Sequence, residues 1–269
     1  EVFNPGLLDN RLRFSLDGRD ISSLYLDNGY LFFQVGPQER VIGNDSIDLD
    51  IKIYEGPQAT IDRVIIKGND RTNEHVIRRE LYTRPGDKFS RQDIIRSQRQ
   101  IAALGYFNPE TLGVNPITNP VKKTVDIEYT VEEKPSDQLE LSAGWGGAGR
   151  GVIGTLGVSF NNFSIHNILK KESWNPLPQG DGQRLSLRAQ SNGKYFQSYN
   201  ASFTEPWLGG KKPMSFTVGG FLTNLTNGQD KSSTSYSNLK IINGTVGLGT
   251  RLKWPDDNFI LNTELNIQS

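Results

Sequence analysis

The stretch GWGGAG, residues 144–149, is the motif in this sequence that most resembles a cofactor site, because it satisfies the spacing G-x-G-x-x-G. That spacing holds the pyrophosphate of a dinucleotide when the loop opens a helix, whose N-terminus supplies backbone N–H groups. The residues that follow, RGVIGTLGVSF, are strand-like and too rich in glycine for a helix. We therefore predict a glycine-rich hairpin here and no cofactor.

The two histidines, His75 and His166, are the remaining candidates for acid–base or metal chemistry. Neither has a nucleophile or a second ligand nearby in sequence, and cysteine is absent, so a thiolate site is excluded. We expect one at an exposed helix start and the other in a turn. The carboxylates at 48 and 50, and at 132 and 133, are typical of solvated strand faces. The sequence thus predicts no catalytic residue, no metal site and no enzyme.

The charged and the glycine-rich residues divide the chain near residues 135–138. Residues 1–137 carry 18 Lys and Arg, 22 Asp and Glu and 10 glycines, whereas residues 138–269 carry 12, 8 and 18. The formal net charge of zero argues against nucleic acid as the main partner. The sequence contains no run of 18 apolar residues, so it predicts no membrane-spanning helix. The N-terminal residues lack a signal-peptide core and start in the middle of a module, which suggests a partial chain.

Two similar segments, DLDIKIYEGP at 48–57 and DIEYTVEEKP at 126–135, point to a repeated module. In the complete copy we predict a strand over 59–68, a helix over 72–83, a helix over 90–105 capped by Ser90, and two strands over 106–117 and 122–133. The α+β module therefore spans residues 59–136, and a truncated copy spans residues 1–58.

Residues 137–269 alternate between apolar and polar side chains over seven candidate strands, most of about the 9–11 residues that a tilted membrane strand needs. A water-soluble sandwich and a membrane barrel both produce this pattern. The polar face carries charged residues that would be costly in a sandwich core, which favours a barrel: Arg184, Arg188, Arg251, Lys253 and Glu264. Four aromatic residues near strand ends fit a lipid-interface girdle: Trp145, Tyr195, Trp207 and Trp254.

These features resemble a known family. A β-α-α-β-β module with a helix-ending Gly105-Tyr106 and a last strand running into Glu-x-Pro resembles the POTRA domains of bacterial outer-membrane assembly proteins. The segments VSFNNFSIHNIL and ASFTEPWLGG are similar to the second and fourth barrel strands of the BamA-like family of outer-membrane β-barrel assembly factors. The resemblance spans essentially the whole chain and implies α+β POTRA-type modules followed by a partial antiparallel transmembrane β-barrel, with seven of the sixteen family strands. The turn at 164–182 is longer than the family pattern leads us to expect.

The resemblance implies a function in the bacterial outer membrane, with the N-terminal modules in the periplasm. The family folds and inserts β-barrel clients by templating their strands at the barrel seam, without an energy source. Its partners would be unfolded barrel clients, BamD-like periplasmic lipoproteins on the POTRA arm and outer-membrane lipid. The seam strand here would comprise Gln138, Leu139, Glu140, Leu141, Ser142, Ala143, Gly144, Trp145 and Gly146. The alternatives are a related two-partner-type secretion pore and a passive porin with a periplasmic arm.

Two expectations concern the strand ends. Glycines 144, 146 and 147 either weaken closure of the seam or merely serve a tight hairpin, and the sequence favours neither. Because the modules would be periplasmic, strand parity places the turns at 164–182, 205–212 and 255–258 in the periplasm. The turns at 146–151, 191–194 and 224–240 would then lie at the cell surface.

Overall fold

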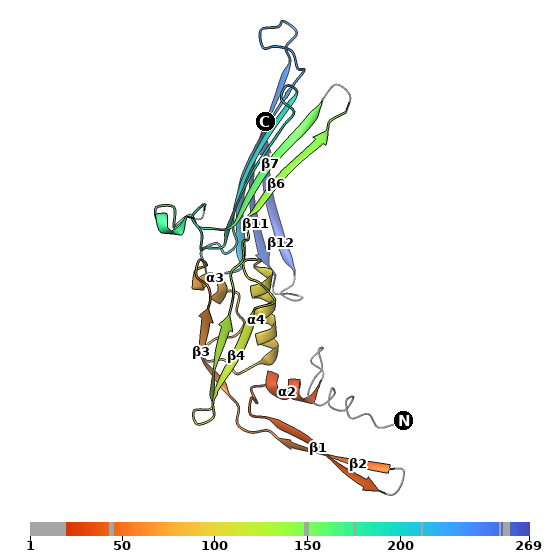
Figure 1. Cartoon of the computed structure of the whole chain (residues 1–269), viewed down its shortest axis with the longest axis vertical. Helices are drawn as coiled ribbons and strands as arrows, with labels where there is room; N and C mark the ends of the chain where they lie inside the picture. Colours follow the sequence, from red (N-terminus) through yellow and green to blue (C-terminus); the bar gives the residue numbers. More distant parts are fainter. Residues whose placement is uncertain are drawn as a thin grey trace. The chain divides into compact units, whose positions relative to one another are not determined.

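The computed structural model describes residues 20–42, 46–147, 151–174, 176–210, 212–252, 254 and 259–269. These residues form two compact units (Figure 1). One contains the described part of Glu1–Asn69 together with Glu80–Lys134, and the other contains Asp70–Arg79 and Pro135–Ser269. The expected turn at 255–258 and Lys253 lie outside the described residues, as does part of the turn at 146–151.

The first described elements of this unit are helix α2 (Ile21–Asp27) and a hairpin of β1 (Gln34–Ile42) and β2 (Ser46–Tyr54). Asp20 caps the helix, because its carboxylate accepts hydrogen bonds from the backbone N–H and the hydroxyl of Ser23, both at 2.7 Å. Apolar residues of the hairpin are exposed, among them Ile47 and Ile51.

The rest of the first unit contains a three-stranded sheet and helix α4 (Arg91–Ala103). Strand β5 (Thr124–Thr130) lies in the centre, parallel to β3 (Thr60–Lys67) and antiparallel to β4 (Gly113–Asn119). Ser90 caps α4 as predicted, since its Oγ accepts from the N–H of Asp93. The buried core is mainly apolar and includes Ala59, Ile61, Val64, Leu81, Phe89, Ile94, Ile101, Phe107, Val125, Ile127, Tyr129 and Val131.

The helix predicted over 72–83 is shorter in the structure, where α3 covers only Glu74–Arg78. Side-chain hydrogen bonds hold the residues beyond the helix in another conformation. The N–H of Tyr82 donates to Ser97 Oγ at 2.9 Å instead of to a carbonyl of a continuing helix, and Thr83 Oγ1 lies 2.9 Å from the hydroxyl of Tyr129. No helix within the described ranges is both long and apolar enough to cross a membrane.

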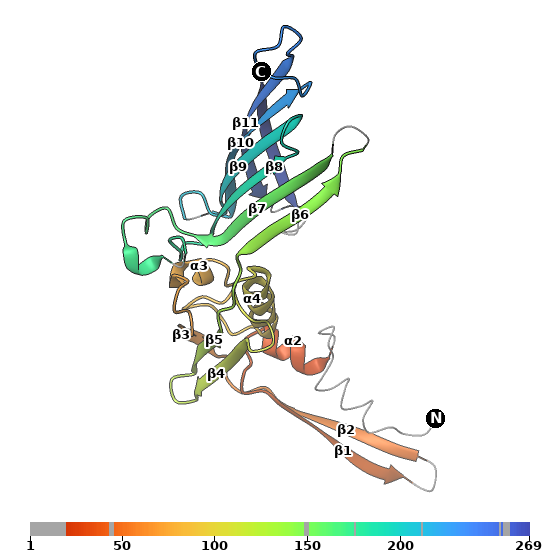
Figure 2. The same ribbon diagram turned by 45° about the horizontal axis from the view of Figure 1, so that its top comes forward.

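The second unit contains one antiparallel sheet of seven strands, in which each strand pairs with its neighbours in sequence (Figure 2). The strands are β6 (Gln138–Trp145), β7 (Val152–Phe163), β8 (Gln183–Ser191), β9 (Phe196–Glu205), β10 (Met214–Thr226), β11 (Asn238–Arg251) and β12 (Ile260–Gln268). All seven predicted strands are therefore confirmed. A short 3-10 helix, η1 (Lys171–Ser173), lies in the long turn between β7 and β8.

The register of the sheet gathers the predicted apolar side chains on one face. One row crosses six strands through directly paired residues: Leu141, Leu156, Ala189, Tyr199, Leu222 and Ile242. Leu141 is 71% exposed and Leu156 is 51% exposed. A sandwich would cover such a face with a second sheet, but the described residues of this unit form a single sheet. An uncovered apolar face across several strands is the pattern of a lipid-facing surface.

The opposite face is polar, and side chains on neighbouring strands hydrogen-bond across it. Ser159 and Ser186 lie 2.9 Å apart at their hydroxyls, and Thr204 and Thr217 lie 3.0 Å apart. Gln190 also donates to Thr155 at 3.1 Å. Cross-strand pairs of this kind stabilise a sheet and suit a face that lines a lumen.

Candidate functional site

Strand β6 forms one edge of the seven-stranded sheet. It pairs with β7 from Gln138 opposite Ser159 to Trp145 opposite Val152, and no other described strand pairs with it. All eight of its residues are exposed. An unpaired strand edge presents a row of N–H and C=O groups that can accept another strand.

One hydrogen bond identifies which backbone groups of β6 face this open edge. The N–H of Gly146 donates to the carbonyl of Gly151 at 2.8 Å, across the hairpin to β7. Donors that face the same neighbour recur at every second residue of an antiparallel strand, and the β6–β7 register has no irregularity. The even-numbered residues therefore bond to β7. The open edge carries the N–H and C=O groups of Leu139, Leu141, Ala143 and Trp145.

The first half of β6 is also tied down by side chains. Asp137 accepts a hydrogen bond from the N–H of Asn161 at 3.2 Å, and Asn161 Nδ2 donates to the carbonyl of Ser136. Glu140 forms an ion pair with Arg188 on β8, with 2.9 Å between Oε1 and Nη2. This pair crosses β7 over Gly157, where a Cβ would lie 3.0 Å from Glu140 Oε2. Glycine at this position leaves room for the ion pair.

The second half of β6 lacks comparable ties among the described contacts. Gly144 has no atom within 4 Å of the position that a Cβ would take, and neither has Gly147. Gly147 has a φ of +90°, which favours glycine and fits the hairpin explanation of this stretch. Strand β7, and not a helix, follows the glycine-rich segment. The polypeptide is thus more firmly held at Gln138 than at Trp145.

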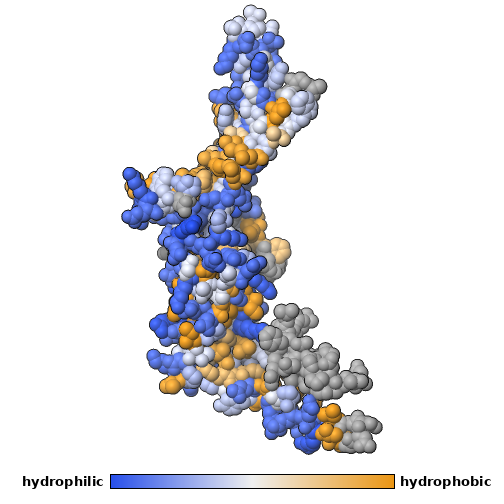
Figure 3. Space-filling view, in the orientation of Figure 1, coloured by the Kyte–Doolittle hydropathy of each residue, from blue (hydrophilic) through white to orange (hydrophobic). Residues whose placement is uncertain are grey.

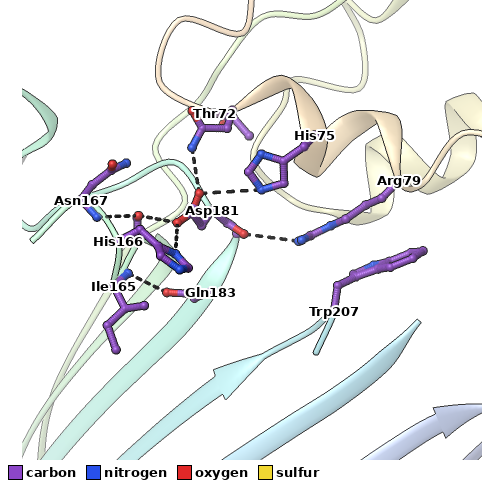
Figure 4. A network of polar contacts seen from close by, with 12 residues as sticks. Thr72, His75, Arg79, Ile165, His166, Asn167, Asp181, Gln183 and Trp207 are labelled. Atoms are coloured by element: carbon purple, nitrogen blue, oxygen red, sulfur yellow. Dashed lines mark hydrogen bonds and ion pairs between the residues drawn. The ribbon is translucent and has the colours of Figure 1, made fainter. Parts of the chain in front are cut away.

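A second polar feature surrounds Asp181, just before β8 (Figure 4). Its carboxylate accepts hydrogen bonds from Ser164 Oγ at 2.5 Å and from Asn73 Nδ2 at 2.8 Å. His166 Nδ1 lies 3.1 Å from the same carboxylate and His75 Nε2 lies 3.7 Å from it. These contacts join the turn between β7 and β8 to residues 70–79 of the same unit.

Further contacts surround this Asp181 cluster. Asn162 Nδ2 donates to Thr72 Oγ1 at 2.9 Å. The side chain of Arg79 donates to the backbone carbonyl of Asp181 at 3.3 Å and lies over the ring of Trp207, 5.7 Å from its centroid. Among the described residues, no three His, Asp or Glu side chains are arranged to hold a metal ion. The cluster is therefore suited to structural support.

The pKa of the Asp181 carboxyl is held below its ordinary value of 3.8. Burial by itself would raise this pKa, but the hydrogen bonds from Ser164, Asn73 and His166, and the charge of His75, outweigh it. A depressed pKa means that the carboxylate stabilises the folded state above pH 3.8, and that this contribution is lost as the pH falls through the folded-state pKa.

We predict that Asp181→Asn loosens residues 70–79, because the amide cannot accept all of these hydrogen bonds. Losing hydrogen bonds to a charged group costs roughly 1.5–3 kcal/mol each in a buried site. Hydrogen–deuterium exchange at pH 7 should show the N–H of Asn73, which donates to the carbonyl of Gly180 at 2.9 Å, exchanging about ten times faster, since 1.4 kcal/mol is tenfold. Asp230→Asn, at an exposed loop residue, should leave this rate unchanged.

No pattern in the sequence pointed to this cluster. His75 and His166 are exposed as expected, but both lie beside a carboxylate that is 106 and 15 residues away. Among the predicted interface aromatics, Trp145 and Tyr195 adjoin the strand ends near the β6–β7 hairpin, and Trp207 and Trp254 adjoin the opposite ends. Trp145 is 73% exposed and Trp254 is 83% exposed. Their contact with lipid stays a prediction.

Comparison with known proteins identifies both parts of the chain. Residues 59–134 match the POTRA model, described as a surface antigen variable number repeat, and residues 179–269 match the Omp85 superfamily domain. The chain thus combines a POTRA domain with an Omp85 superfamily domain. It therefore has a POTRA-type α+β module followed by antiparallel strands of an outer-membrane barrel, as predicted.

Proteins similar to this chain include assembly factors. The outer membrane protein assembly factor BamA of Neisseria meningitidis is 27% identical over 264 residues, which cover 94% of this chain and 29% of that protein. The crystal structure of Haemophilus ducreyi BamA lacking POTRA domains 1–3 shares the fold, with a TM-score of 0.73 at 20% identity, over 100% of this chain and 45% of that one. The chain thus spans less than a third of the curated relatives.

A second group of solved structures shares the fold less closely. CdiB from Acinetobacter baumannii matches with a TM-score of 0.52 at 13% identity, over 89% of this chain and 42% of that one. The similarity to outer membrane assembly factors places this protein in the bacterial outer membrane, with its POTRA module in the periplasm.

Proposed function

We propose that this protein belongs to the machinery that folds and inserts β-barrel proteins into the outer membrane. The observation that carries the proposal is the open edge of β6, whose outward-facing N–H and C=O groups belong to four consecutive alternate residues. An incoming client strand would add to this edge by backbone hydrogen bonds, with little dependence on its side chains. The names of the curated relatives support the same function.

The side-chain contacts of β6 indicate the end of the strand from which a client would be released. The ties at Asp137 and Glu140 hold the periplasmic half of the strand against β7 and β8, while the glycine-rich half has only its backbone ladder. A client strand would therefore pair along a firm base and leave from the looser end near Trp145. Separating the client strand from β6 breaks about one hydrogen bond per pair of residues, and thermal motion can break these bonds one after another.

The structural similarity to CdiB gives some support to an alternative function, a pore that secretes a passenger protein through its lumen. The CdiB structures share the fold at a lower TM-score and identity than BamA does. A secretion pore would use the polar face of the sheet, whereas an assembly factor would use the β6 edge. A passive porin, the other alternative, would need neither the β6 edge nor a client protein. The partners of the assembly proposal are unfolded barrel clients, lipoproteins on the POTRA arm, and membrane lipid.

Disulfide cross-linking to a stalled client tests the proposal. Ser142 bonds to β7 through its backbone, so a strand added at the open edge would meet it as a non-hydrogen-bonded pair. Such pairs have the closest side chains, which favours a disulfide. A cysteine at Ser142 should therefore link to the terminal strand of a client barrel stalled during assembly in cells.

The matched control is a cysteine at Ser186, which also lies on the polar face. Ser186 is paired on both sides, with Ser159 on β7 and Ser202 on β9, so it offers no place for a client strand. Cross-linking at Ser142 and not at Ser186 supports assembly at the edge. Equal cross-linking at both, or none at Ser142 with the client shown to be stalled, would contradict it and favour the porin.

A further inference from the structure

The long turn between β7 and β8 has an exposed apolar tip. Leu169 is 94% exposed, and Ile165, Ile168 and Trp174 are each more than 40% exposed. Lys170 and Lys171 lie among them in the sequence and are also exposed. A group of exposed apolar side chains next to basic ones marks a surface that meets something other than water.

Several polar groups of this turn are hydrogen-bonded within the turn itself. The N–H of Lys170 donates to the carbonyl of Asn167 at 2.9 Å, and the N–H of Ser173 donates to the carbonyl of Lys170 at 3.0 Å. The indole N–H of Trp174 donates to the carbonyl of Ile168 at 3.2 Å. Because an unpaired polar group is costly away from water, these internal bonds reduce the cost of moving the tip into a partly dehydrated region.

The Asp181 cluster fixes the base of the turn to the sheet. Ser164 Oγ donates to Asp181 and accepts from the N–H of Asn167 at 3.1 Å. Asn167 Nδ2 donates to the carbonyl of Gln179 at 3.0 Å, which closes the turn from the other side. The exposed tip is therefore presented in a set orientation, and its apolar side chains need no further ordering to bind.

The turn adjoins the apolar face of the sheet. Phe163, the last residue of β7, packs edge-on against Phe203 of β9, with ring centroids 6.3 Å apart. In Figure 3 the apolar surface of the strands reaches towards the base of this turn. The turn follows β7, and β6 begins where the periplasmic module ends, so the turn lies at the periplasmic ends of the strands.

We propose that the tip of this turn is a membrane anchor that contacts the periplasmic leaflet of the outer membrane. Leu169 and Trp174 would enter the boundary between headgroups and acyl chains, where tryptophan is enriched. Lys170 and Lys171 would meet the phosphates of anionic phospholipids, which attract basic residues near a membrane surface. The lipid is favoured over a protein partner by the continuity with the lipid-facing sheet and by the two lysines.

The test uses the full-length protein, in a background without other cysteines, reconstituted in vesicles of phosphatidylethanolamine and phosphatidylglycerol. Leu169→Cys is labelled with an environment-sensitive NBD fluorophore, and the acyl chains carry bromine close to the headgroup. We expect a blue-shifted emission that the brominated lipid quenches at least twofold. The same label at Lys231→Cys, in the exposed loop between β10 and β11, should stay in water and be unquenched.

A second variant separates the lysines from the apolar residues. Lys170→Glu combined with Lys171→Glu should reduce the quenching at Leu169→Cys in vesicles with phosphatidylglycerol and leave it unchanged in zwitterionic vesicles. An aqueous, unquenched label at Leu169→Cys would overturn the proposal. A blue shift without quenching by brominated lipid would also overturn it, because protein would then cover the tip. If the two Lys→Glu changes leave the quenching in vesicles with phosphatidylglycerol unchanged, the proposed role of the lysines is wrong.

Discussion

Leu141→Pro should reduce assembly of client barrels in cells at least tenfold while the variant itself still folds and reaches the outer membrane. The N–H of Leu141 faces the open edge of β6 and takes no part in the ladder to β7. Proline removes this donor and puts its ring where a client strand would lie. Natural edge strands tolerate proline when the lost N–H faces outward. Folded client in the membrane, quantified by its heat-modifiable mobility, measures the effect.

Two control variants isolate the edge. Leu141→Val keeps the donor and the apolar outward face, so assembly should stay near that of the unmodified protein. Ser142→Pro removes a donor that bonds to β7, so it should weaken the sheet itself and lower the amount of folded variant. If Leu141→Pro is inserted normally and assembles clients at the unmodified rate, the β6 edge is not the template.

Much of the sheet could be predicted from the sequence, because successive side chains of a strand point to opposite faces and leave an alternating apolar and polar pattern. The alternation of Leu139, Leu141 and Ala143 with polar neighbours indicated which face is apolar, and the register continues this face from β6 to β11. The order of the strands followed from short connections, since consecutive antiparallel strands usually pair. Long, regular patterns are therefore the reliable part of such a prediction.

The Asp181 cluster could not be predicted, because its members come from distant parts of the chain. Asn73, Ser164 and Asp181 are each ordinary turn residues by type, and only the fold brings their side chains together. The same applies to Gly157, whose missing Cβ is meaningful only next to the Glu140–Arg188 pair. The helix over 72–83 was overestimated for a related reason, since Ser97, 15 residues from Tyr82, takes its N–H.

Gly68→Ala should destabilise the POTRA-type module by several kcal/mol. Gly68 has a φ of +90°, and a Cβ there would lie far inside the van der Waals contact distance to the carbonyl oxygen of Val131. This carbonyl cannot simply move aside, because the N–H of Val131 donates to the carbonyl of Lys67 at 2.8 Å, where β3 and β5 end together. The variant must break this contact or shift β5, whose buried residues form much of the core.

Gly86→Ala is the matched control, since Gly86 has a φ of +94° but no atom within 4 Å of the position that a Cβ would take. It should cost only the left-handed backbone, about 1–2 kcal/mol. Pulse proteolysis of the protein in urea compares the two variants. The loss of fragments from residues 80–134 reports the unfolding of the module. The difference between the two variants measures the clash with Val131 alone. Equal destabilisation would mean that the end of β5 yields freely and that the close approach of Gly68 to Val131 does not hold the module together.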